Sequence, residues 1–216
     1  MAKKSSGTSI TELKNELSQG KLRPIYLFYG EEGYIKRTYE KKITDMVPDG
    51  GFPEFNHLKF EGTDTALSDY DDAWESFPMM TDKKLIIIRD SKIFKKANEE
   101  TKEFWLEKFK RVSQENVVIF NESEIDKRGV LYKALQKTGM AVEFNYQSES
   151  DLVTWVNRQA LNAKVKMSKD TAAYLVACVD PGLSNLTNEF NKLLSFCDGE
   201  ITKSDVDRVV SKAMSI

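Results

Sequence analysis

Short apolar runs alternate with amphipathic stretches over the first two thirds of the chain. The apolar runs are rich in β-branched and aromatic residues, a composition typical of strands, and they span residues 24–29, 55–60, 85–90, 117–120 and 141–144. Between them, apolar residues recur at intervals of three and four, the period of a helix that packs on one face. Five strands alternating with helices predict a five-stranded parallel sheet with helices on both faces.

The pattern changes after Asn145, where helical periods continue and no further strand is expected. Helix starts are predicted at Ser148, Ser168 and Thr202, because hydroxyl side chains accept hydrogen bonds from the first free N–H groups of a helix. We therefore expect an α/β domain over residues 1–145 and a small all-α bundle over residues 146–216, joined by a short hinge.

Composition limits the classes of function. The 216 residues are 40% hydrophobic, enough for one large or two small cores, and the net charge is only −2. Such balance argues against a dedicated DNA-binding or membrane-surface protein, so any nucleic-acid contact would be local. Two cysteines, Cys178 and Cys197, and the single His57 supply neither a disulfide framework nor a metal cluster. These features suit a reducing cytoplasm, with no metal cofactor and no membrane span.

A candidate phosphate loop lies at Gly30, between the first strand and the next helix. Backbone N–H groups and the helix dipole converge at such a junction. The functional consensus is Gly-x-x-x-x-Gly-Lys-Ser/Thr. Aligned on Gly30, it places Ile35 at the second glycine, Lys36 at the lysine and Arg37 at the metal-binding hydroxyl. Ile35 hinders close approach of the backbone to phosphate, and Arg37 offers the metal no oxygen.

Two interpretations of this loop remain open. Gly30 and Gly33 can serve only a tight turn, or the loop can be a nucleotide site that has lost ATP binding. The third strand ends at Arg89-Asp90, where a working ATPase could carry a carboxylate pair for metal and water. We expect no catalytic residues and no nucleotide cofactor. The alternative is an ATPase with an atypical loop in which Lys36 still grips phosphate, although lysine is common in the first turn of a surface helix.

A basic stretch over residues 83–111 carries ten basic and five acidic residues. Such a run is usually the solvated face of a helix. Direct DNA binding is the alternative, and the interleaved acidic residues weaken it.

A hydrophobic turn precedes the third strand. Helical spacing predicts one buried stripe composed of Tyr70, Ala73, Trp74 and Phe77. Pro78 then ends the helix, so Met79 and Met80 fall in the turn. The pattern alone slightly favours methionines that fold back into the core. The alternative is an exposed anchor for a partner, since thioether side chains adapt to irregular apolar pockets.

Several segments, taken in order, resemble the delta subunit family of the bacterial DNA polymerase III clamp loader, within the AAA+ superfamily. They cover residues 24–32, 77–88, 125–128, 131–135, 142–144, 151–155 and 201–206. The resemblance implies an AAA+/RecA-type sheet followed by a lid-like bundle. It also implies a subunit of a pentameric ATP-driven loader that does not itself hydrolyse ATP.

The resemblance further implies that Phe77, Pro78, Met79 and Met80 bind the sliding clamp, the beta subunit, and help to open it. Other loader subunits and primed DNA would be met only within the complex. Family members carry a third, collar domain that holds the pentamer together, and the sequence stops at Ile216 without it. We expect this chain to be monomeric by itself and to form no stable pentamer. It would be either a piece of a longer protein or a short homologue.

Overall fold

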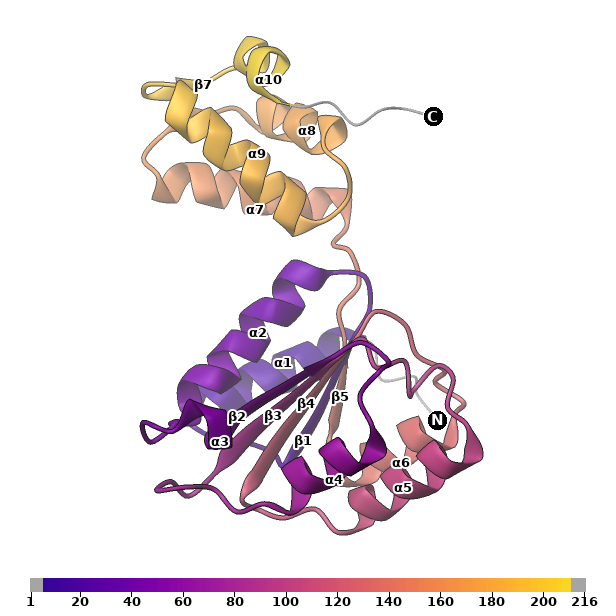
Figure 1. Ribbon diagram of the computed structural model, residues 1–216. Coiled ribbons are helices and arrows are strands. Elements are labelled where there is room, and N and C mark those ends of the chain that lie inside the picture. The colour runs from indigo at the N-terminus through magenta and orange to yellow at the C-terminus, as the bar shows by residue number, and fades with distance from the viewer. Residues whose placement is uncertain (1–5, 211–216) are drawn as a thin grey trace. The chain divides into compact units, whose positions relative to one another are not determined.

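The computed structural model describes residues 6–210 and contains two compact units (Figure 1). The chain passes from the first unit to the second between Phe144 and Asn145, and the short segment Glu32–Tyr34 is grouped with the second unit. No helix among the described residues is long and apolar enough to cross a membrane.

The first unit is built on a five-stranded sheet in which all neighbouring strands are parallel. Its strand order is β2-β3-β4-β1-β5, which places the most apolar strands in the middle. The strands are β1 (Ile25–Tyr29), β2 (His57–Glu61), β3 (Lys84–Arg89), β4 (Asn116–Glu122) and β5 (Met140–Glu143). The predicted parallel sheet is confirmed.

Helices cover both faces of this sheet, as predicted, because side chains alternate between the faces along each strand. Ile86 and Ile88 belong to the core beneath α4, α5 and α6, whereas Leu85 and Ile87 belong to the core beneath α1 and α2. Figure 1 shows the two layers. The helices are α1 (Ser6–Ser18), α2 (Gly33–Met46), α3 (Pro53–Asn56), α4 (Leu67–Glu75), α5 (Glu99–Lys110) and α6 (Val130–Thr138).

The second predicted strand begins later than expected. Pro53 occupies the first turn of the four-residue helix α3, where its fixed φ and missing N–H are tolerated. Phe55 and Asn56 therefore lie in a helical turn, and the strand starts at His57.

The described part of the second unit contains four helices: α7 (Glu149–Asn162), α8 (Lys169–Cys178), α9 (Leu183–Phe196) and α10 (Lys203–Val209). The predicted caps are confirmed, since Ser148, Ser168 and Thr202 each accept a hydrogen bond from the third helical N–H. The expectation that no strand follows Asn145 is wrong, since β6 (Lys166–Met167) and β7 (Glu200–Ile201) form a short parallel pair. Two residues are too few to produce a recognisable alternation.

Candidate functional site

The loop between β1 and α2 is only three residues long, from Gly30 to Glu32. Gly30 has a φ of +110°, and a Cβ atom there would lie 2.3 Å from the carbonyl oxygen of Phe144. The Phe144 N–H donates a 2.7 Å hydrogen bond to the carbonyl of Tyr29 at the same place. Close approach of the chain after β5 therefore accounts for this glycine without any ligand.

The residues aligned with the second half of the phosphate consensus lie inside α2. The helix begins at Gly33, so Ile35 and Lys36 are in its first turn rather than in a loop that could surround a phosphate. Ile35 packs half-buried against the core beneath α1 and α2, and Arg37 is exposed. The Lys36 ammonium is buried and donates a 2.8 Å hydrogen bond to the backbone carbonyl of Glu122.

An ion pair occupies the end of β3, where an ATPase could carry its carboxylates. Arg89 binds the buried carboxylate of Glu40 on α2, with Nε at 3.2 Å from Oε2. The side-chain amide of Asn121 donates to the same oxygen at 3.0 Å. Hydrogen bonding to Glu40 raises the pKa of Arg89, so its guanidinium stays charged. Asp90, the next residue, is exposed.

The carboxylate of Glu122, at the end of β4, is also enclosed. It accepts hydrogen bonds from the backbone N–H groups of Ser91 at 3.1 Å and Lys92 at 3.0 Å, and from the Ser91 hydroxyl. Burial raises the pKa of Glu122 despite these donors. In open parallel sheets, ligands bind at the carboxyl ends of the strands. Around Glu40 and Glu122 this edge is occupied by contacts between the protein's own side chains, whereas a pocket of about 340 Å³ remains beside the ends of β2 and β3.

The hydrophobic turn is exposed. Helix α4 ends at Glu75, and Ser76 already has an extended backbone with ψ of 150°. Phe77 therefore leaves the helical stripe and is 79% exposed, although Tyr70, Ala73 and Trp74 are buried as predicted. The prediction that Phe77 belongs to the buried stripe is wrong, because the helix stops two residues earlier.

The methionines of this turn are exposed as well. Met79 is 41% and Met80 is 83% exposed, whereas Pro78 is half-buried. The slight preference of the sequence pattern for methionines in the core is therefore wrong. We refer to Phe77–Met80 as the docking turn. It presents three large apolar side chains to solvent within four residues, an arrangement typical of a binding surface.

Asn56, which is not part of this turn, bonds to its backbone. It was not identified from the sequence. Its side chain is fully buried at the end of α3. Its Oδ1 accepts a hydrogen bond from the Met79 N–H, and its Nδ2 donates to the Met79 carbonyl, both at 2.7 Å. Nδ2 also donates to the Asp49 carbonyl at 2.8 Å. A single asparagine outside any periodic pattern gives no signal that could have identified it.

Lys84, the first residue of β3, supports the other end of the turn. Although it belongs to the basic stretch, it is 0% exposed. Its ammonium donates to the Ala73 carbonyl at 2.6 Å, to the Ser76 hydroxyl at 2.8 Å and to the Ser76 carbonyl. Burial lowers the pKa of Lys84 to about 8. The expectation of a solvated face is wrong for this residue.

Most other charges of the basic stretch have acidic partners. Ion pairs with carboxylates are formed by Arg89, Lys95, Lys102, Lys108 and Arg111. Since phosphate binding relies on cations that are free to pair with the backbone of nucleic acid, this arrangement favours the solvated-face interpretation over a DNA-binding strip.

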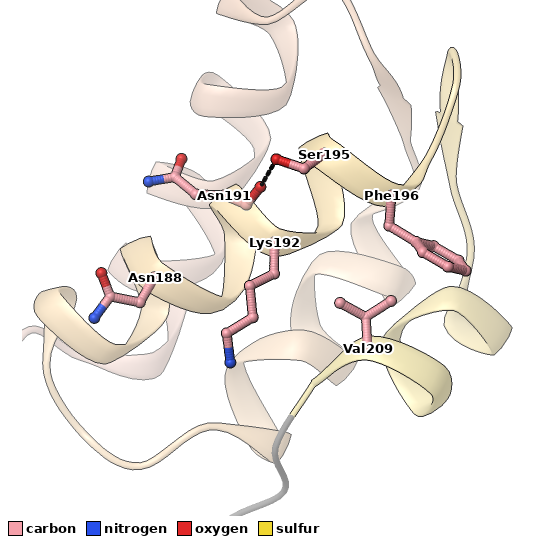
Figure 2. A pocket seen from close by; sticks show the side chains of 6 residues that line it. All are labelled: Asn188, Asn191, Lys192, Ser195, Phe196 and Val209. Atoms are coloured by element: carbon pink, nitrogen blue, oxygen red, sulfur yellow. Dashed lines mark hydrogen bonds between the residues drawn. The ribbon is translucent and has the colours of Figure 1, made fainter.

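The second unit carries an open hollow of about 640 Å³ between α9 and α10 (Figure 2). It is lined by Asn188, Asn191, Lys192, Ser195, Phe196 and Val209. The Lys192 ammonium pairs with Glu189 at 2.7 Å, and the Ser195 hydroxyl donates to the Asn191 carbonyl. Its charged group is therefore already paired, and the described residues contain no group of three metal-ligating side chains.

Comparison with known proteins gives a consistent result. The sequence model of the family "DNA polymerase III, delta subunit" matches residues 26–145. The DNA polymerase III subunit delta of Bacillus subtilis is 25% identical over 218 residues, which cover 95% of this chain and 62% of that protein. The chain thus spans less than two thirds of the length of this relative.

Solved structures show the same fold. A Bacillus subtilis DNA clamp loader delta protein superimposes with a TM-score of 0.66 at 22% identity, covering 94% of this chain and 63% of that one. The Thermotoga maritima RuvB branch migration motor gives 0.62 at 12% identity, covering 95% and 68%. Domain III of the Thermotoga maritima replication initiation protein DnaA gives 0.57 at 13%, covering 96% and 92%. The predicted fold class, an AAA+-type sheet followed by a helical domain, is confirmed.

Proposed function

Because this chain belongs to the DNA polymerase III delta subunit family, we propose that it is a clamp-loader subunit that binds the sliding clamp. In this role it helps to open the clamp for loading onto primed DNA and does not hydrolyse ATP itself. Residues 1–145 act as an AAA+-like domain with a degenerate phosphate loop, and residues 146–216 act as its lid-like bundle.

The observation that carries the proposal is the exposed docking turn. Phe77 and Met80 are 79% and 83% exposed on a turn whose backbone is held by buried side chains. Exposed apolar side chains on a fixed element suit insertion into an apolar pocket of a partner, where a few such anchors supply most of the binding free energy. The thioethers of Met79 and Met80 can adapt to the shape of that pocket.

The contacts at the carboxyl ends of β3 and β4 agree with a subunit that does not hydrolyse ATP itself. Lys36 is bonded to the Glu122 carbonyl, and Arg89 to Glu40. These contacts use the two positions at which an ATPase would hold phosphate and metal. They therefore disfavour the alternative of an ATPase with an atypical loop. Other loader subunits, and primed DNA within the complex, are the remaining partners that we propose.

The test is titration of the purified chain against the sliding clamp of the same organism. Replacing Met79 and Met80 together by alanine should weaken binding by about 2 kcal/mol or more, as expected for central anchors. The melting temperature should stay nearly unchanged, because both side chains project from the fold.

Leu161→Ala is the matched control, since Leu161 is 77% exposed but lies on α7 in the second unit. It should bind like the wild type. Equal clamp affinity of wild type and a well-folded Met79→Ala, Met80→Ala variant would place the anchor elsewhere.

A further inference from the structure

We infer that Lys84 and Asn56 are positioning residues that hold the docking turn in its binding conformation from its two ends. The inference rests on the proposed clamp-binding function. Neither side chain belongs to the turn, and both are fully buried, so neither can touch the clamp itself.

Lys84 fixes the point at which the chain leaves α4. The last carbonyls of a helix have no partner within the helix and carry its negative dipole end, which favours a cation. The Lys84 ammonium satisfies the Ala73 carbonyl and binds both the carbonyl and the hydroxyl of Ser76. Ser76 is the residue directly before Phe77. The direction in which the chain enters the turn is therefore set by a side chain eight residues further on.

Asn56 fixes the other end. Its amide makes two hydrogen bonds with the backbone of Met79, in the manner of a neighbouring strand, and a third ties it to the Asp49 carbonyl. The turn after α2 packs closely here, since a Cβ atom on Gly50 would lie 3.2 Å from the Met79 carbonyl oxygen and 2.6 Å from Thr81 Cγ2. Met79 is thereby held from two directions.

The turn needs this support because its backbone is strained. Met80 has a φ of +60°, a left-handed conformation that is unfavourable for a side chain other than glycine. Such strain persists only where the surroundings fix it. A turn fixed before binding loses less conformational entropy when it docks, which strengthens the complex without any added contact.

Two variants of the full chain test the inference, each measured without and with the sliding clamp of the same organism. Lys84→Met removes the ammonium and keeps a long side chain, and Asn56→Ala removes the amide. Amide hydrogen exchange in the free chain reports the turn directly: the Ser76 N–H is bonded to the Asp72 carbonyl, and the Met79 N–H to Asn56. Ile88→Val is the matched control, because Ile88 is a fully buried residue of β3. Its hydrocarbon side chain forms no hydrogen bond that could hold the turn.

We expect exchange at Ser76 in Lys84→Met, and at Met79 in Asn56→Ala, to be about tenfold faster or more, with exchange in the core of β3 unchanged. Clamp affinity should fall about tenfold in each variant, through lost preorganisation. Ile88→Val should lower stability and change neither the turn nor the affinity. A purely structural role predicts that all three variants lower stability and leave the clamp affinity unchanged.

Unchanged exchange at Ser76 and Met79 would overturn the inference, as would folded variants that bind the clamp as tightly as the wild type. A wild-type chain that binds no clamp would instead overturn the proposed function. The two failures are therefore distinguishable.

Discussion

The ammonium of Lys36 donates a 2.8 Å hydrogen bond to the backbone carbonyl of Glu122, joining the first turn of α2 to the end of β4. In a working phosphate loop the equivalent lysine reaches the β- and γ-phosphates of the nucleotide. Here the buried Lys36 links two elements of the fold. Lys36 occupies the position of the phosphate-loop lysine, and its contact is structural.

This contact predicts that the chain binds ATP only weakly. Binding would have to break the Lys36 bond, and Arg37 offers magnesium no oxygen ligand. Isothermal calorimetry with ATP and magnesium should detect no micromolar binding, under conditions in which a phosphate-loop ATPase is saturated. Magnesium-dependent micromolar affinity would refute both the prediction and the degenerate-loop interpretation.

A second prediction concerns stability. Lys36→Met leaves the Glu122 carbonyl without its partner, and an unsatisfied buried acceptor costs about 1 to 3 kcal/mol. The free energy of unfolding, measured with urea, should fall by this amount. Arg37→Met, at the next and exposed position, should change it by less than about 0.5 kcal/mol. If Lys36 served only to bind phosphate, Lys36→Met would leave the free energy of unfolding unchanged.

The sheet could be predicted from the sequence because its strands coincide with five local apolar runs along the chain. The end of α4 could not. The helical spacing of apolar residues continues through Phe77, whereas the helix stops at Glu75. At this end the ammonium of Lys84, from the next strand, binds the carbonyls of Ala73 and Ser76. A contact between residues distant in sequence has no periodic signature.

Asn56 illustrates the same limit at the candidate site. The apolar character of the docking turn is visible in the sequence, but its backbone is bonded to a buried amide that lies 23 residues earlier. The prediction that the basic stretch is a solvated face is wrong at one residue for a related reason. Lys84 directly follows the half-buried Lys83 and has the same local composition, and only the position of α4 above β3 explains its burial.

A third prediction concerns Gly30, where a side chain would both clash with Phe144 and strain the positive φ. Gly30→Ala would place a Cβ atom 2.3 Å from the Phe144 carbonyl oxygen and strain a φ of +110°. We expect the free energy of unfolding to fall by at least about 2 kcal/mol. Gly20→Ala is the control, because Gly20 has a φ of +72° but no atom within 4 Å of the added Cβ. It should cost about 1 kcal/mol. Equal effects of the two variants would show that the close approach of Phe144 is unimportant.

A fourth prediction concerns Phe77. Because its ring is 79% exposed, Phe77→Ala removes no core packing, and the melting temperature should stay nearly constant. Affinity for the sliding clamp should fall by at least about 1 kcal/mol if the ring enters the partner's pocket. Phe196→Ala is the control, since Phe196 is 57% exposed on α9. A clamp titration in which both variants match the wild type would remove Phe77 from the anchor.

The last prediction follows from the pKa of Lys84, which burial lowers to about 8 while the carboxylates of Glu115 and Glu75 partly oppose the shift. Above pH 8 the folded chain releases this proton, whereas the unfolded chain keeps it until about pH 10.4. The unfolded state therefore holds more protons in this window, and raising the pH favours the folded state.

The free energy of unfolding of the wild type should consequently rise relative to that of Lys84→Met between pH 7.5 and 9.5. The slope should approach about 1.4 kcal/mol per pH unit above pH 8. Buried tyrosines such as Tyr29 also have raised pKa values, but they are present in both proteins and cancel in the difference. Lys110→Met, which removes an exposed lysine of α5, should show no such slope. The free energy of unfolding is measured by guanidinium unfolding, followed by tryptophan fluorescence, at several pH values. Parallel plots of this free energy against pH for wild type and Lys84→Met would show that Lys84 keeps its proton throughout.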